Sequence, residues 1–167
     1  MKAKRCHDQE HASPGDTGAV RDFYDKTAEK YDRQISFFER VLFTGGRAWV
    51  CSQAYGDVLE IAAGTGRNLR HYPLNVRLTT IELSPAMLEV ARREAAVLGR
   101  EADLRVGDAQ ALEFLNDSFD TVVCTLGLCT IPDDQTAVRE AKRGTAPRRT
   151  FRPARACTQP DAGDPDL

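Results

Sequence analysis

The stretch "VLEIAAGTGRNL", residues 58–69, is an apolar run that includes one acid and passes into a loop with two closely spaced glycines. Short β-branched and apolar runs of this kind are typical of a strand buried on both faces of a parallel sheet. Gly64 and Gly66 let the backbone turn sharply and approach a ligand with no Cβ in the way. A tight turn that holds no ligand is the alternative that this stretch leaves open.

Strand and helix patterns alternate along the chain around this loop. The strand patterns cover residues 57–62, 76–83, 103–108 and 119–126. The clearest helix pattern covers residues 84–99, where Ser84 can cap the start and Gly99 suits the end. Such alternation predicts an α/β fold in which helices cover a parallel sheet. Ligands of such sheets bind beyond the carboxyl ends of the strands.

Further helix patterns frame this core. Residues 19–54 carry apolar side chains at spacings of three and four, which suits amphipathic helices. Downstream, Asp133 or Asp134 can cap another helix. One more helix is expected to follow Gly66 and to end near His71.

Two acids follow the second and third predicted strands. Glu82 ends the second strand, 22 positions after Glu60. A carboxylate there can accept hydrogen bonds from both hydroxyls of a ribose, because the sheet sets it beside the glycine loop. Asp108 lies where an adenine amino group could bind, although alone it would be a turn or cap residue. A dinucleotide motif has a third glycine where Leu69 stands, so a nucleoside is favoured over NAD.

The ordered combination of these motifs resembles the class I S-adenosylmethionine-dependent methyltransferases. The resemblance is carried by "FYDKTAEKYD", "VLEIAAGTGRNL", "TTIELSPAMLEVARREA" and "LRVGDAQALEFLNDSFDTVVCTLGLCTIPD", and it covers about residues 20–143. Within the class, it is similar to the small-molecule branch that includes the ubiquinone/menaquinone-biosynthesis and phospholipid methyltransferases. It implies a Rossmann-like methyltransferase sheet in a three-layer αβα arrangement, S-adenosylmethionine as cofactor, and a small or lipid-like methyl acceptor.

The resemblance also implies which residues bind the cofactor. They are Tyr24, Tyr31, Glu60, Ala62, Gly64, Gly66, Glu82, Met87, Asp108, Ala109, Thr125 and Leu126. Glu60, Gly64 and Gly66 match the first motif, whose loop meets the methionine part of the cofactor. Glu82 matches the acid on the ribose, and Met87 can flank the adenine.

The later motifs supply the other contacts that the resemblance implies. Asp108 with Ala109 matches the adenine contact, whereas Thr125 and Leu126 would border the sulfonium and the methyl acceptor. Ala62 departs from the family, which usually has glycine at this position. The alanine is tolerated if its φ is negative, and a positive φ costs about 1 kcal/mol or more.

Aromatic residues near the N-terminus allow two interpretations. Tyr24 and Tyr31 match a "YDxxAxxYD" pattern that resembles a cover over the cofactor, and packing in a helix core is the alternative. Four more aromatic side chains suit an apolar acceptor or a membrane surface, although an ordinary core is favoured for them. They are Phe37, Phe38, Phe43 and Trp49.

The expected chemistry demands little of the protein beyond alignment. Methyl transfer from a sulfonium is a direct displacement, so the reacting groups mainly have to be aligned. No serine or cysteine lies in a GxSxG-type motif, and no catalytic residue is predicted. His71 is a possible base, but a structural role is favoured for it. The five cysteines form no CxxC pair, and His7 and His11 lack further ligands, so no metal site is expected.

Composition narrows the functional classes. A chain of 167 residues with 41% hydrophobic content predicts one domain with an ordinary core. The formal net charge of −2 argues against binding that depends on nucleic-acid phosphates. No apolar run approaches a signal peptide or a membrane span of roughly 20 residues, so a cytoplasmic location is expected.

The expected organisation has four parts. A disordered leader covers residues 1–17, N-terminal helices 18–56, the S-adenosylmethionine-binding core 57–143, and a disordered or out-of-frame tail 144–167. The tail holds four of the eight prolines and no Ile or Val, whereas the family continues into three further strands. We therefore expect a truncation or a frameshift after about residue 143. The fourth strand would then be an exposed edge, open to self-association.

Two alternatives to an active methyltransferase remain open from the sequence. The first is a catalytically silent remnant or interaction module, which would bind the cofactor and transfer no methyl group. The second is an NAD(P)-dependent oxidoreductase, which Leu69 disfavours.

Overall fold

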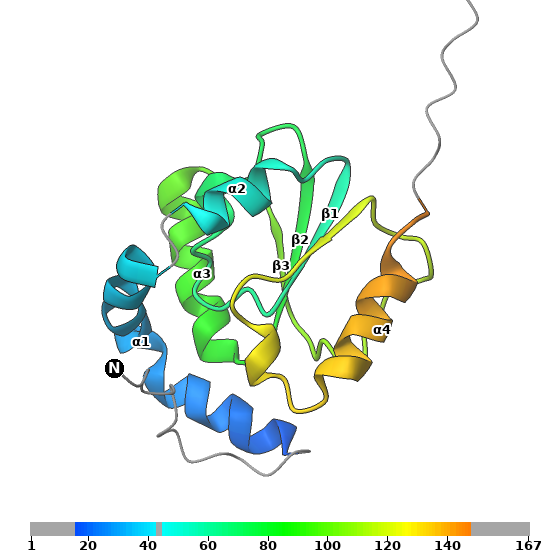
Figure 1. Ribbon diagram of the computed structural model, residues 1–167. Coiled ribbons are helices and arrows are strands. Elements are labelled where there is room, and N and C mark those ends of the chain that lie inside the picture. The colour runs from blue at the N-terminus through cyan, green and yellow to red at the C-terminus, as the bar shows by residue number, and fades with distance from the viewer. Residues whose placement is uncertain (1–15, 43–44, 148–167) are drawn as a thin grey trace, which may run out of the picture.

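The computed structural model describes residues 16–42 and 45–147, and in them a parallel sheet is flanked by helices (Figure 1). The strands are β1 (Asp57–Ile61), β2 (Arg77–Glu82), β3 (Asp103–Val106) and β4 (Thr121–Val123). All pairings are parallel, and the strand order is β3-β2-β1-β4. The predicted α/β, Rossmann-like fold class is therefore confirmed.

The central strand β1 explains why its sequence is apolar throughout. Val58 packs in one hydrophobic cluster, on the face covered by α2 and α3, whereas Leu59 and Ile61 pack in a second cluster with Ala137 of α4. Successive side chains of a strand point to opposite faces, so burial on both faces requires a continuous apolar run. Glu60 interrupts this run and is nevertheless buried.

The helices form layers on both sides of the sheet (Figure 1). They are α1 (Thr17–Leu42), α2 (Gly46–Ser52), α3 (Pro85–Leu98) and α4 (Asp134–Gly144). Helix α1 packs along α3, and α4 lies on the opposite face of the sheet. This arrangement is the three-layer architecture expected from the sequence.

The ends of α3 and α4 follow from their capping residues. The Ser84 hydroxyl accepts a hydrogen bond from the Met87 N–H at 3.1 Å, and Gly99 ends α3 in a left-handed conformation with φ of 59°. Asp133 caps α4 by accepting from the Thr136 N–H at 2.9 Å. The predicted caps of both helices are confirmed.

Two local expectations were wrong in length. The helix expected after Gly66 is a single 3-10 turn, Leu69–His71. Leu69 is buried in the core, and Pro73, which cannot donate a backbone hydrogen bond, prevents the helix from continuing. Strand β4 ends at Val123, before the predicted end at residue 126. Leu126 has a positive φ of 58°, which turns the chain away from the sheet.

The outer side of β4 is partly occupied by the chain that follows α4. Thr145 forms a parallel bridge with Phe119, and the Ala146 N–H donates to the Phe119 carbonyl at 2.8 Å. Among the described residues, β1 is the only strand that pairs with β4 itself. The expected leader, up to residue 15, and the tail from residue 148 lie outside the described residues.

The surface carries one aromatic side chain that was expected in the core. Trp49 on α2 is 69% exposed, because α2 turns Cys51 rather than Trp49 toward the sheet. The side chains of Phe37, Phe38 and Phe43 lie outside the described part of the structure. None of the described helices combines the length and apolar character needed to cross a membrane.

Candidate functional site

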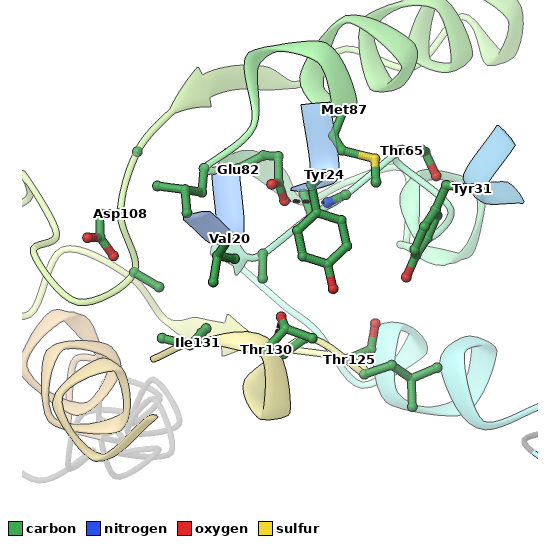
Figure 2. Close-up of a pocket in the computed structure, with 18 of the residues that line it drawn as sticks. Val20, Tyr24, Tyr31, Thr65, Glu82, Met87, Asp108, Thr125, Thr130 and Ile131 are labelled. Atoms are coloured by element: carbon green, nitrogen blue, oxygen red, sulfur yellow. Dashed lines mark hydrogen bonds between the residues drawn. The ribbon is translucent and has the colours of Figure 1, made fainter. Parts of the chain in front are cut away.

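A pocket lies at the carboxyl ends of β1 and β4, where the strand order changes direction (Figure 2). Open α/β sheets bind ligands at this switch point. Ten of the predicted cofactor-binding residues line it: Tyr24, Tyr31, Ala62, Gly64, Glu82, Met87, Asp108, Ala109, Thr125 and Leu126. The other two predicted residues, Glu60 and Gly66, do not line it.

The two loop glycines have different surroundings. Gly64 has a φ of 58°, and a Cβ built on it would meet nothing within 4 Å. Gly66 has a φ of 81°, and a Cβ there would lie 2.8 Å from Leu69 and 3.1 Å from Ala91. Gly64 therefore leaves space for a ligand beside the loop backbone, whereas Gly66 lets the loop pack closely against α3. Leu69 fills the space where the third glycine of a dinucleotide motif would stand.

Glu82 holds the glycine loop through its carboxylate. Its two oxygens accept from the Gly64 N–H at 2.8 Å and from the Ser84 N–H at 2.9 Å. Only 6% of the residue is exposed. Burial raises the pKa of Glu82, and the backbone N–H groups oppose this rise. Each carboxylate oxygen has a second lone pair, so Glu82 can also accept hydrogen bonds from a ligand.

Asp108 caps a turn and also lines the pocket. It accepts from the Gln110 N–H at 2.8 Å and from the Gln110 Nε2 at 3.0 Å, which makes it a turn-capping residue. It also lines the pocket next to the buried Ala109. Met87 lies at the start of α3 on the pocket wall (Figure 2).

Tyr24 and Tyr31 extend from α1 over the pocket, as Figure 2 shows. Their rings meet edge to face, with centroids 6.1 Å apart. Burial raises the pKa of Tyr24 to about 12, so its phenol stays neutral near pH 7. Neither tyrosine lies among the core residues of the fold.

Two aspartates of α1 bond this helix to the rim of the pocket, and neither is among the predicted site residues. Asp25 accepts from the Ser84 hydroxyl at 2.5 Å and from the Ala86 N–H at 3.1 Å. Asp32 accepts from the Thr65 hydroxyl at 2.6 Å. The signal was present, since the "YD" pair repeats after seven residues, about two helical turns, and places both aspartates on one side.

A side-chain network lies under the other end of the pocket. The Asn68 Nδ2 donates to Glu60 Oε1 at 2.6 Å and to Thr125 Oγ1 at 2.7 Å. The Arg47 Nη1 donates to Thr125 Oγ1 at 2.6 Å and to Asn68 Oδ1 at 3.1 Å. Burial raises the pKa of Glu60 to about 7, and the Asn68 amide opposes the rise. The second Glu60 oxygen is buried with no hydrogen-bond partner among the described residues.

Ala62 and Leu126 face the same turn in strained conformations. Ala62 has a φ of 54° and Leu126 a φ of 58°, both in the left-handed region that favours glycine. A Cβ on Gly127 would lie 2.7 Å from the Ala62 Cβ. The favourable case considered for Ala62, a negative φ, is thus excluded, and the absence of a side chain at Gly127 makes room for the Ala62 methyl group.

Comparison with known proteins decides the family. Residues 58–148 match the model of a methyltransferase domain. The chain belongs to this methyltransferase family. The match confirms the resemblance seen in the sequence, with S-adenosylmethionine as the cofactor, and the oxidoreductase alternative is set aside.

Individual relatives of this methyltransferase domain support the assignment. A malonyl-[acyl-carrier protein] O-methyltransferase of Halorhodospira halophila is 34% identical, with 81% of this chain and 48% of that protein covered. A phosphatidylethanolamine N-methyltransferase of Cereibacter sphaeroides is 38% identical over 53% of this chain and 44% of the relative. The YcgJ protein of Bacillus subtilis is a structural match with a TM-score of 0.57 and 28% identity, covering 62% of this chain and 47% of that chain. This methyltransferase chain thus spans about half the length of these relatives.

The residues of the methyltransferase pocket fit an adenosine-containing cofactor. Glu82 offers acceptors for ribose hydroxyls, and Gly64 leaves open space where any Cβ would project. Asp108 offers an acceptor for an amino group at one side of the pocket, and Arg47 supplies a positive charge in its lining. In the described part of the chain, no cluster of three or more His, Cys, Asp or Glu side chains could hold a metal ion.

Other chemically reactive side chains lie away from the pocket lining. His71 is half-buried and borders a neighbouring polar hollow rather than the pocket. Cys124 packs beside the hydrophobic cluster under α4, and burial raises the pKa of its thiol. The structure therefore adds no evidence for a histidine base or a cysteine nucleophile.

Proposed function

We propose that the chain binds S-adenosylmethionine in the switch-point pocket and transfers its methyl group to a small or lipid-like acceptor. The observation that carries this proposal is the joining of the glycine loop to Glu82 by the Gly64 N–H, 2.8 Å from the carboxylate. This bond supports the proposal because it holds a carboxylate, which would accept hydrogen bonds from ribose hydroxyls, beside a backbone that leaves room for a ligand. The relatives that act on a phospholipid and on an acyl-carrier-bound acid support the acceptor class.

The protein's own part in such a reaction is alignment. The cofactor supplies a methyl carbon activated for displacement by its sulfonium. Glu82 and Asp108 would orient the adenosine part by accepting hydrogen bonds, while Tyr24 and Tyr31 would cover the pocket and limit access of water. No described side chain is assigned as a catalytic acid or base.

A catalytically silent cofactor-binding protein is the second candidate. It is favoured by one observation, namely that among the described residues β1 is the only strand that pairs with β4. In this case the pocket would bind the cofactor, and other proteins would pair with the outer side of β4. We also propose that the chain is located in the cytoplasm and that it self-associates through the outer side of β4.

Methyl transfer from labelled S-adenosylmethionine separates the two candidates. The purified chain is incubated with the labelled cofactor and a cell extract, and the label is followed into organic and aqueous phases. A lipid-like acceptor carries the label into the organic phase, and a small polar acceptor keeps it in the aqueous phase. Cofactor binding without any transfer of label favours the silent candidate. Heat-treated chain gives the background.

A further inference from the structure

The Thr125 hydroxyl has its hydrogen-bonding direction fixed by two neighbours. A hydroxyl group has two acceptor lone pairs and one hydrogen to donate. The Thr125 Oγ1 accepts hydrogen bonds from the Arg47 Nη1 at 2.6 Å and from the Asn68 Nδ2 at 2.7 Å. Both lone pairs are therefore occupied, and only the hydrogen is left for another partner.

The orientation of the Asn68 amide is fixed as well. Arginine has donors and no acceptor, so the Asn68 atom facing Arg47 Nη1 at 3.1 Å has to be the carbonyl oxygen. The NH2 group of Asn68 then faces Thr125 and Glu60 Oε1. Asn68 is 1% exposed, so water cannot compete for these bonds. The Thr125 hydroxyl is therefore an acceptor toward Asn68 and cannot donate its hydrogen to that side chain.

Thr125 borders the pocket, so its hydroxyl hydrogen is able to point toward a bound ligand. Thr125 lies at the end of β4 in the pocket lining, and Figure 2 shows it across the cavity from Met87. Among the described residues, none accepts a hydrogen bond from this hydroxyl. A ligand oxygen with a free lone pair would complete its hydrogen bonding, whereas an ammonium group would not.

The distribution of charge in the pocket indicates which ligand oxygen this is. Glu82 and Asp108 make one part of the lining acidic and suited to ligand hydroxyl and amino groups. Arg47 lies in another part of the lining and contacts Thr125 directly, whereas Arg67, which also lines the pocket, pairs with Asp32 at 3.3 Å. A carboxylate is the ligand group that matches a hydroxyl donor next to a guanidinium. S-adenosylmethionine has one carboxylate, on its amino-acid part.

We propose that Thr125 is a positioning residue that donates a hydrogen bond to the cofactor's carboxylate, with Asn68 and Arg47 fixing the direction of its hydroxyl. This proposal rests on the proposed function and goes further, because it gives one atom of the chain a defined role in holding the amino-acid end of the cofactor. Holding this end limits rotation of the bound cofactor about its sulfonium.

Two probe ligands test the proposal by calorimetric titration. S-adenosylhomocysteine carries the carboxylate, and 5′-methylthioadenosine lacks the amino-acid part but keeps the adenosine and the sulfur. Thr125→Val should weaken S-adenosylhomocysteine binding about 10- to 100-fold, as expected for a lost hydrogen bond to a charged group. It should leave binding of 5′-methylthioadenosine within about twofold of the natural chain. Thr125→Ser keeps the hydroxyl and should behave like the natural chain with both ligands.

The outcomes that overturn the proposal are distinct. Equal weakening of both ligands by Thr125→Val would show a structural role for Thr125. Unchanged binding of S-adenosylhomocysteine would show that the hydroxyl does not bond the cofactor, and a methyl acceptor would be its remaining partner. If the natural chain binds neither ligand, the proposed function itself fails, and the role of Thr125 fails with it. Thermal melts of each variant show whether the fold is kept.

Discussion

The two ends of the pocket are held in different ways. At the acidic end, Glu82 and Asp108 accept hydrogen bonds from backbone N–H groups of nearby loops. At the other end, Arg47, Asn68 and Thr125 bond one another through side chains from three separate segments. The acidic end depends on short motifs, whereas the network depends on packing that brings distant segments together. The first should be sensitive to backbone changes and the second to side-chain chemistry.

The glycine loop gives the largest expected effect, because it sets the backbone of the acidic end. Gly66→Ala combines a positive φ with a Cβ only 2.8 Å from Leu69, so we expect the free energy of unfolding to fall by about 3 kcal/mol. Gly64→Ala is the matched control, since its Cβ meets nothing within 4 Å. It should cost about 1 kcal/mol of stability and mainly weaken ligand binding. Urea unfolding of both variants measures the difference, and equal losses would contradict it.

Glu82→Gln tests the acidic end directly. The amide keeps the size of the side chain but offers one oxygen in place of two, so either Gly64 or Ser84 loses its acceptor. We expect S-adenosylhomocysteine and 5′-methylthioadenosine to bind about 100-fold more weakly, a loss of roughly 3 kcal/mol, because both ligands contain the ribose. This pattern contrasts with that of Thr125→Val, which should affect only one ligand. A selective effect of Glu82→Gln in calorimetry would break the distinction between the two ends.

The network end should be recognisable from its pH dependence. The pKa of Glu60 is raised to about 7 by burial, so the folded chain binds a proton that the unfolded chain releases. This group therefore stabilises the fold at low pH, and its contribution is lost as the pH rises through about 7. Between about pH 5.5 and 7.5 the loss should be on the order of 2 kcal/mol.

Glu60→Gln isolates this contribution of the network. The variant cannot titrate at this position, so its stability should change less over the same pH range than that of the natural chain. Denaturant unfolding at several pH values gives the comparison. A natural chain that gains stability relative to Glu60→Gln as the pH rises would contradict the assigned direction.

Ala62 gives the smallest expected effect, at the turn between the two ends. Ala62→Gly removes the strain of a φ of 54°, and the greater freedom of glycine in the unfolded chain offsets part of the gain. We expect a net change of about 1 kcal/mol or less in favour of the fold, or a rise in melting temperature of about 2–4 °C. Gly127→Ala should act in the opposite direction, because its Cβ would lie 2.7 Å from Ala62. A lower melting temperature for Ala62→Gly would count against strain at this residue.

The fold and the acidic end could be predicted because their signals are local. The apolar run of β1, the Ser84 and Gly99 caps, and the acids at the ends of the second and third strands are features of short segments. All of these lie where the sequence indicated. The carboxyl ends of parallel strands lie at one edge of the sheet, so forming the sheet is enough to bring these residues together.

The side-chain network of Arg47, Asn68 and Thr125 could not be predicted from the sequence, because it depends on contacts between distant segments. Arg47 and Thr125 are 78 residues apart, and their contact depends on how α2 packs against the sheet. The exposure of Trp49 depends on the same packing, and its expected burial was wrong. The glycine that the family usually has at the position of Ala62 raised the question of a positive φ, but the sequence did not decide its sign. Long-range side-chain contacts and backbone strain thus require the structure.

Calorimetric titration of the whole chain with S-adenosylhomocysteine tests the central claim most directly. The pocket that joins the glycine loop, Glu82 and Thr125 should bind one molecule per chain, and NADH should not bind at the same concentrations. The ligand should also raise the melting temperature, because it binds the folded state. A folded chain that gives no heat of binding and no thermal shift with S-adenosylhomocysteine would contradict the account.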